Sequence, residues 1–336
     1  MQWYALAGLG ILLIIAIAAG LLAGPVSVRD LLSNESLRGP VLMQLRIPRV
    51  ILGIFVGAAL AVAGAAFQGT LRNPLATPYT LGVAGGASLG AYVVIFVQNL
   101  ILRTRFNVIT PSWYHLVFVP LGAFAGGLLT VALVYGLAKN RGKLSSYSLI
   151  LAGVVINFTF ASVILLLNYI SDFTQVFVMI RWMMGGLTIV GSSVLYVTVP
   201  IVVICLALLL SAHRCFDILA FGEVTAHSMG LDVERFIRWV FIVTSIMVGM
   251  CVAVCGPIGF VGLVIPHVLR LAFGGRHGFL LPASMLGGAA FLCLADALAR
   301  VILPNQILPV GVLTALIGGP ILAVLLLRGS GYEVRD

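Results

Sequence analysis

The sequence predicts an all-α integral membrane protein with ten membrane-spanning helices, folded as a single domain over residues 1–336. Two observations support this fold class. Of the residues, 61% are hydrophobic and only 9% are charged, whereas soluble proteins carry about 25% charged residues and need them on a water-facing surface. The apolar runs are also long and continuous, as spanning helices of about 20 residues require. They lack the alternation of apolar and polar residues that is typical of β-barrel strands.

Ten apolar runs place the predicted spans along the chain. Between the fourth and fifth lies the basic stretch 139–143, and between the sixth and seventh lies a polar stretch with Arg214, Arg235 and Arg238. Cytoplasmic loops carry an excess of Lys and Arg, so we expect both stretches, and both termini, on the cytoplasmic side. The runs cover residues 3–24, 47–69, 76–101, 116–138, 149–168, 190–212, 237–256, 258–273, 279–303 and 308–327.

Because both basic stretches are expected on the cytoplasmic side, the chain must cross the membrane an even number of times between them. The ambiguous piece 176–186, which carries Arg181, therefore cannot be an eleventh span. We predict that it forms a short helix at the outer interface and ends at Gly185 and Gly186. Residues 3–24 lack the basic segment that begins a signal peptide, so we expect a retained first span.

The formal net charge of +9 does not indicate a nucleic-acid partner. Lys and Arg lie between the apolar runs, where lipid headgroups and membrane topology account for them. The predicted topology puts only a small majority of the Lys and Arg residues on the cytoplasmic side. Either that topology is wrong, or the outer arginines serve another purpose.

Glycines spaced four residues apart predict close helix packing. Small residues let the backbones of membrane helices approach each other, although such spacing does not by itself indicate a transport route. The pattern occurs at Gly53 and Gly57, at Gly82, Gly86 and Gly90, and at Gly122 and Gly126.

Few residues could carry chemistry at mid-membrane depth. Ion-coupled transporters and intramembrane enzymes keep ionisable groups there, but the apolar runs offer little beyond His267 and Asp296, and we expect Asp296 to pair with Arg300 four residues on. The five cysteines are interpreted as small buried side chains. With no metal-ligand spacing and no nucleophile motif, the chain is expected to bind no cofactor and to catalyse no reaction.

The sequence also has no phosphate-binding P-loop. The nearest stretch, from Gly136 to Lys143, has the wrong spacing and continues with Leu144 instead of Ser or Thr. If ATP drives this protein, we expect ATP and Mg²⁺ to bind to another chain.

The polar stretch from His213 to Arg238 predicts two short helices on the membrane surface. Asp217 is a possible N-cap of the first, Gly230 suits a C-terminal left-handed residue, and Asp232 can cap the next span. Apolar residues on these helices would form either a docking surface for a soluble partner or an ordinary interfacial helix. They are Ile218, Leu219, Phe221, Val224 and Met229.

With these features, the chain resembles the FecCD family, the permease subunits of binding-protein-dependent ABC importers for iron siderophores, haem and vitamin B12. The resemblance runs nearly end to end. It implies a type II ABC importer permease fold, a homodimer around a central path, two separate ATP-binding cassette subunits and a periplasmic or lipid-anchored binding protein. The matching motifs are Arg46-Ile47-Pro48-Arg49, GAALAVAGAAFQGTLRNPLATPYTLGVAGGASLGA from Gly57, residues 149–154, 182–186 and 219–230, GPIGFVGLVIPHVLRL from Gly256, LADALAR from Leu294, and LPVGVLTALIGGP from Leu308.

The resemblance also assigns roles to residues. The segment 213–235 matches the family's coupling helices, so Leu219, Gly222, Glu223, Ala226 and Gly230 would contact the ATPase and pass on its motion. Arg46, Arg49 and Arg300 would receive carboxylates of the binding protein, although Arg46 and Arg49 could instead reach toward headgroups. The cytoplasmic gate would consist of Asn73, Leu75, Ser146 and Tyr147. Tyr147 is bulkier than expected at such a gate, and the Asn73-Pro74-Leu75 turn could serve packing alone.

These features together predict ATP-driven uptake by alternating access across the cytoplasmic membrane of a bacterium or archaeon. The resemblance implies an iron chelate, siderophore or haem, as cargo, with vitamin B12 (cobalamin) and molybdate as alternatives. A secondary transporter, which would need buried carboxylates, and a channel or scaffold are alternatives from other classes.

Overall fold

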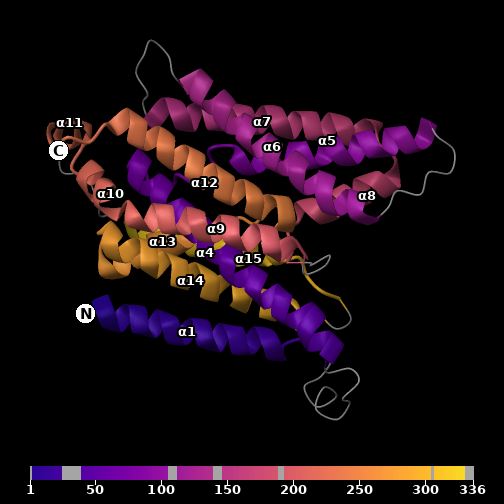
Figure 1. The fold of residues 1–336 in the computed structure, drawn as a ribbon, viewed down its shortest axis with the longest axis horizontal. Coiled ribbons are helices and arrows are strands. Elements are labelled where there is room, and N and C mark those ends of the chain that lie inside the picture. The colour runs from indigo at the N-terminus through magenta and orange to yellow at the C-terminus, as the bar shows by residue number, and fades with distance from the viewer. Residues whose placement is uncertain are drawn as a thin grey trace.

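The computed structural model describes residues 2–24, 39–104, 112–138, 146–187, 193–303 and 306–329, and the regular structure in these ranges is helical. Figure 1 shows the helices running roughly alongside one another in one bundle. In chain order they are α1 (Gln2–Leu22), the π-helix η1 (Pro40–Arg46), α4 (Ile47–Leu71), α5 (Val83–Thr104), α6 (Ser112–Ala138), α7 (Ser146–Ile170), α8 (Phe173–Met183), α9 (Ser193–Ser211), α10 (His213–Ala220), α11 (Glu223–Ser228), α12 (Val233–Cys255), α13 (Val261–Phe273), α14 (His277–Ala299) and α15 (Val310–Gly329).

The predicted all-α membrane fold is confirmed, and every one of the ten apolar runs overlaps a helix. Within the described ranges, seven helices are long and apolar enough to cross a membrane, and Val83–Gln98, Val261–Phe273 and Val310–Leu325 are shorter apolar helices. At 1.5 Å per residue, α13 is about 20 Å long, which is less than the roughly 30 Å of a hydrocarbon core. Helix length alone therefore does not establish ten full crossings.

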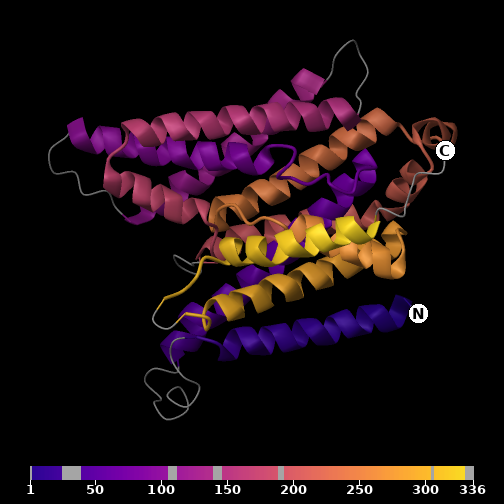
Figure 2. The ribbon, with the colours of Figure 1, turned by 180° about the vertical axis from the view of Figure 1, so that it is seen from behind.

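The two ends of the bundle differ in what they carry. The start of α1 and the end of α15 lie at the same end as α10 and α11, whereas α8 lies toward the opposite end (Figures 1 and 2). The predicted short helix is therefore present as α8, although it begins before residue 176 and ends at Met183. We call the end of the bundle that carries α10 and α11 the α10 end, and the opposite end, which carries α8, the α8 end.

Helix α4 occupies the centre of the bundle, and glycines set how closely its neighbours approach. A Cβ atom placed on Gly57 would overlap the carbonyl of Gly288 in α14, and one on Gly64 would overlap the carbonyl of Gly262 in α13. Helices α5 and α6 meet in the same way. The close packing predicted from glycine spacing is thus confirmed, and it extends to glycines that the spacing did not single out.

Two local predictions were wrong. Residues 76–82 were expected in a helix but form turns, because Pro78 interrupts the segment and the hydroxyl of Thr80 accepts a hydrogen bond from the backbone N–H of Thr77 at 2.8 Å. Asp217 does not cap α10, which begins at His213 directly after α9. Asp217 instead lies within α10, where Phe216 and Leu219 fix the buried face.

Other local predictions held. The side chain of Asp232 accepts a hydrogen bond from the backbone N–H of Arg235 at 3.0 Å and so caps α12. Gly230 has a positive φ of 85°. The five cysteines are free, and four of them are buried.

Candidate functional site

Helices α10 and α11 present an apolar surface at the α10 end. Phe221, Val224 and Met229 are 73%, 83% and 57% exposed. Gly222 lies between the two helices with φ +105°, a conformation that residues with a side chain rarely adopt. Exposed apolar residues grouped on two short helices mark a surface for a protein or a membrane.

The five predicted coupling residues occupy two different environments. Glu223 and Gly230 are exposed and Gly222 is partly exposed, so these three belong to the surface. Leu219 and Ala226 are fully buried beneath it. If Leu219 and Ala226 take part in coupling, they do so by holding α10 and α11 on the bundle.

The predicted gate residues also lie at the α10 end. The Oδ1 atom of Asn73 accepts a hydrogen bond from the backbone N–H of Leu75 at 2.9 Å, which forms a tight turn after α4. Tyr147, in the first turn of α7, is 76% exposed. Ser146 opens α7, but its side chain is outside the described residues. We call residues 72–76 the gate loop.

One buried cluster joins the gate loop to α7. Ala76 of the loop and Leu149, two residues after Tyr147, share a group of packed apolar residues with Phe67 and Leu71 of α4. The structure thus brings both predicted parts of the gate to one end of the bundle. Their role as a gate stays a prediction.

At the α8 end, Asp296 binds two of the three predicted docking arginines. Arg49 donates from Nε and Nη2 to Asp296 Oδ1 at 2.9 and 2.8 Å. The Nη2 atom of Arg300 lies 3.1 Å from Asp296 Oδ2. The predicted Asp296–Arg300 pair is confirmed, but sequence spacing gave no sign of Arg49, which lies 247 residues away from Asp296.

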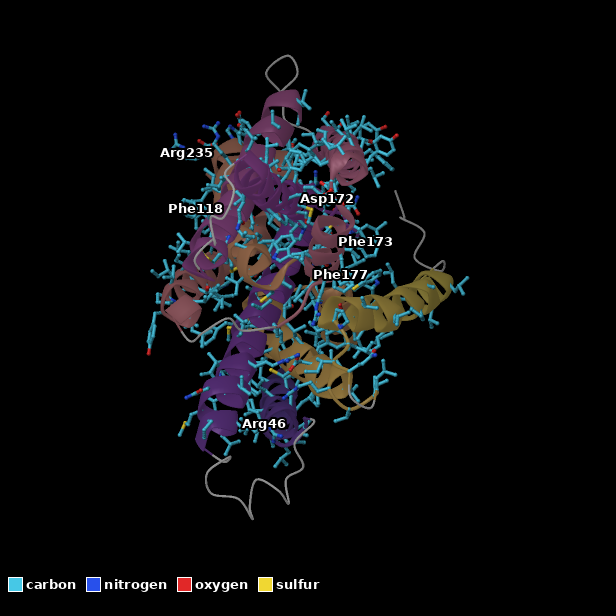
Figure 3. The ribbon with its side chains drawn as sticks, turned by 90° about the vertical axis from the view of Figure 1, so that its right-hand side faces the viewer. Arg46, Phe118, Asp172, Phe173, Phe177 and Arg235 are labelled. Atoms are coloured by element: carbon cyan, nitrogen blue, oxygen red, sulfur yellow. The ribbon has the colours of Figure 1, made fainter. Side chains whose placement is uncertain are left out.

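The third arginine, Arg46, and Arg300 bind the end of α1. Arg46 Nη1 donates to the carbonyl of Leu21 at 2.7 Å, and Arg300 donates from Nη1 to that of Ala23 at 2.8 Å and from Nη2 to that of Gly20 at 2.9 Å. Arg46, labelled in Figure 3, is 4% exposed, and Arg300 is 6% exposed. The last carbonyls of a helix lack intrahelical partners and carry partial negative charge, so these guanidinium groups cap α1.

A cavity of about 400 Å³ lies near Arg49. It is lined by Arg49 and Arg181 and otherwise mostly by apolar residues of α4, α5, α6, α8, α9 and α12. No Asp or Glu is among the described residues that line it. The described part of the cavity therefore has a cationic edge and mostly apolar walls.

Sequence reasoning missed two contacts at the α10 end. Arg72 Nη2 lies 3.4 Å from Glu223 Oε1. Asp217 Oδ1 accepts a hydrogen bond from the backbone N–H of His277 at 2.7 Å and lies 2.9 Å from its Nδ1 atom. Both pairs are far apart in the sequence, and no spacing pattern could have found them.

Comparison with known proteins identifies the family. The FecCD transport family matches residues 10–328 of the chain. The chain belongs to this family. This FecCD-family permease is 41% identical over 290 residues to the Fe(3+) dicitrate transport system permease protein FecD of Escherichia coli, a match that covers 86% of this chain and 85% of FecD.

Two further relatives support the assignment. The permease is 36% identical over 322 residues to the vitamin B12 import system permease protein BtuC of Vibrio parahaemolyticus, covering 95% of this chain and 92% of that protein. A solved structure assigned to a metal-chelate type ABC transporter in an inward-facing conformation matches with a TM-score of 0.83 and 31% identity, covering 96% and 98% of the two chains. The protein is therefore a multi-pass membrane permease of the ABC transporter type.

Proposed function

We propose that this FecCD-family permease is the membrane subunit of an ATP-driven importer, and that ATP and Mg²⁺ bind to a separate pair of ATP-binding cassette subunits. The observation that carries the proposal is the exposed apolar surface of α10 and α11 next to the gate loop. Because the sequence has no P-loop, ATP that drives transport would have to bind to another chain. This surface is where that chain would bind.

In this proposal the α10 end faces the cytoplasm, together with both termini. Closure of the ATPase subunits displaces α10 and α11, and the gate formed by Asn73, Leu75, Ser146 and Tyr147 responds. The cargo then passes by alternating access, and in this proposal the chain itself binds no cofactor. Support comes from the position of α10, α11 and the gate loop at one end of the bundle.

A second copy of the chain would complete the path. Large apolar side chains of α7 and α8 are exposed, among them Phe158, Tyr169 and Phe173. Figure 3 shows Phe173 and Phe177 at the side of the bundle between α7 and α15. Lipid or a second protomer must cover this face, and a homodimer would place a central path there.

For the cargo we propose an iron chelate, siderophore or haem. FecD, with 41% identity, is named for iron dicitrate, and the structural relative is assigned to metal chelates. Vitamin B12 is the first alternative because BtuC is nearly as similar, and molybdate is the second. Purifying the co-expressed binding protein and identifying its bound ligand by mass spectrometry and by its visible absorption would decide between them, and retention of a corrin would refute the iron chelate.

Uptake into proteoliposomes tests the energy source. The permease, its ATPase and the loaded binding protein should accumulate cargo only with ATP and Mg²⁺. An ATPase variant that binds ATP without hydrolysing it should give no accumulation. Accumulation by the permease alone in an ion gradient would instead establish a secondary transporter, and ATP-independent equilibration would indicate a channel.

A further inference from the structure

The last turn of α4 is in direct contact with α14. A Cβ atom placed on Gly69 would lie only 2.5 Å from Nε2 of His277 and 3.2 Å from its Cε1 atom, so the imidazole ring rests on the α4 backbone. His277 is 3% exposed. A ring packed this closely cannot move toward α4 without displacing the α4 backbone.

The same histidine is bound by α10. The ring of Phe216 stacks on that of His277, with centroids 5.3 Å apart and an interplanar angle of 25°. Asp217 Oδ1 binds both the backbone N–H of His277, at 2.7 Å, and its Nδ1 atom, at 2.9 Å. Asp217 therefore fixes both the first turn of α14 and the orientation of the ring to α10.

A second contact joins the gate loop to α11. Arg72 follows the last residue of α4 in the left-handed conformation, with φ 49°. Its side chain reaches Glu223 at 3.4 Å, and its Nη1 atom lies 3.6 Å from the place of a Cβ atom on Gly222. Arg72 thus lies over the junction of α10 and α11. The next residue, Asn73, holds the turn to Leu75.

We propose that these two contacts transmit the displacement of α10 and α11 to the gate loop through the last turn of α4, and that Asp217, His277 and Arg72 are positioning residues for transport. The inference rests on the proposed function, because it requires an ATPase on the α10–α11 surface. The buried contact through His277 moves α10, α14 and the end of α4 as one unit. The contact between Arg72 and Glu223 aligns the gate loop with α11.

The Arg72–Glu223 pair has a matched control. Arg238 and Glu234 form an ion pair at 3.0 Å with side chains 50% and 43% exposed, close to the 45% and 46% of Arg72 and Glu223. Arg238 lies on α12 and also donates a hydrogen bond from Nε to the hydroxyl of Tyr135 of α6 at 3.1 Å. Both Arg72→Gln and Arg238→Gln remove an exposed ion pair, and Arg238→Gln also removes the contact to Tyr135, but only Arg72→Gln separates α11 from the gate loop.

The experiment measures cargo transported per ATP hydrolysed by the purified, reconstituted complex, together with the yield of assembled complex. We expect Arg72→Gln and Asp217→Ala to lower this ratio by roughly 2- to 30-fold, with ATP hydrolysis and assembly retained. Arg72→Lys should restore much of the ratio. Combining Arg72→Gln with Glu223→Gln should lower it no further than Glu223→Gln alone, since both changes break one contact.

Three results would overturn the inference while leaving the proposed function intact. They are a wild-type ratio in Arg72→Gln, an equal fall in Arg238→Gln, or effects of Arg72→Gln and Glu223→Gln that multiply. If Asp217→Ala does not assemble, the Arg72 series decides. A wild-type complex that hydrolyses ATP and transports no cargo would instead refute the proposed function, and the inference with it.

Discussion

At the scale of single residues, the charges at the α8 end are arranged to satisfy one another. Asp296 is 2% exposed and receives both Arg49 and Arg300. Arg46 and Arg300 also donate hydrogen bonds to the carbonyls at the end of α1. A buried charge without a partner costs several kcal/mol, so the cluster is stable only when every member is present.

The first prediction concerns Asp296→Asn. The change keeps the size of the side chain but removes the negative charge between the buried guanidinium group of Arg300 and the partly buried one of Arg49. Breaking a buried ion pair costs about 3–5 kcal/mol, so the midpoint of thermal unfolding in detergent should fall by several degrees. Asp232→Asn is the control, because Asp232 is an exposed N-cap and Asn caps helices about as well. Equal midpoints for the two variants would contradict a stabilising role for Asp296.

A second prediction concerns the docking of a binding protein on Arg46, Arg49 and Arg300. These groups are engaged within the chain, so a partner's carboxylate must replace Asp296 or the α1 carbonyls in order to bind them. If they form the docking site, Arg46→Glu combined with Arg49→Glu should weaken binding of the binding protein by at least tenfold, because two charge-assisted bonds are lost.

The same double change should also lower the thermal midpoint, since it breaks the contacts to Asp296 and to α1. Binding must therefore be measured well below that midpoint, by surface plasmon resonance on assembled complex. Unchanged affinity in a folded variant would assign these arginines to the structure of the permease alone.

At the scale of helices, contacts between backbones decide which positions accept a side chain. Gly64 faces the carbonyl of Gly262, whereas Gly136 of α6 has no heavy atom of a neighbouring element within 4 Å of an added Cβ atom. Gly64→Ala must therefore push α4 and α13 apart, and Gly136→Ala must not.

The third prediction follows from this difference. Overpacking costs about 1–3 kcal/mol or more, so Gly64→Ala should lower both the yield of folded protein and its thermal midpoint. Gly136→Ala should leave both unchanged or slightly raised, because Ala favours the helix over Gly. Size-exclusion profiles after heating would measure both variants, and a tolerated Gly64→Ala would contradict the close approach of α4 and α13.

Much of the helix order could be predicted because hydrophobic runs and basic loops are local signals. The Asp232 cap and the left-handed Gly230 agree with this. Long-range partners left no such signal. Asp217 was interpreted as a cap because its type and position fit one, but His277, 60 residues away, binds it instead. The docking role of Arg46, Arg49 and Arg300 stays a prediction, and no local pattern indicated that the end of α1 needs hydrogen-bond donors.

At the scale of the whole molecule, the bundle separates two kinds of surface. The α10 end carries Phe221, Val224 and Met229 beside the gate loop, and the α8 end carries buried arginines and the cavity. In the proposed function only the first of these can meet an ATPase, so the α10 end must face the cytoplasm.

The last prediction tests this orientation with single cysteines in a variant whose native cysteines are replaced. Val224 on α11 is 83% exposed, and Val301, which follows the end of α14 at the α8 end, is 56% exposed. In intact cells, a membrane-impermeant maleimide added outside should label Val301→Cys and should leave Val224→Cys unlabelled. In inside-out vesicles Val224→Cys should react, and co-expression of the ATPase should then protect it. Labelling of Val224→Cys from outside intact cells would place α10 and α11 on the wrong side of the membrane for an ATPase, and the proposed coupling through Arg72 and His277 would have no source of motion.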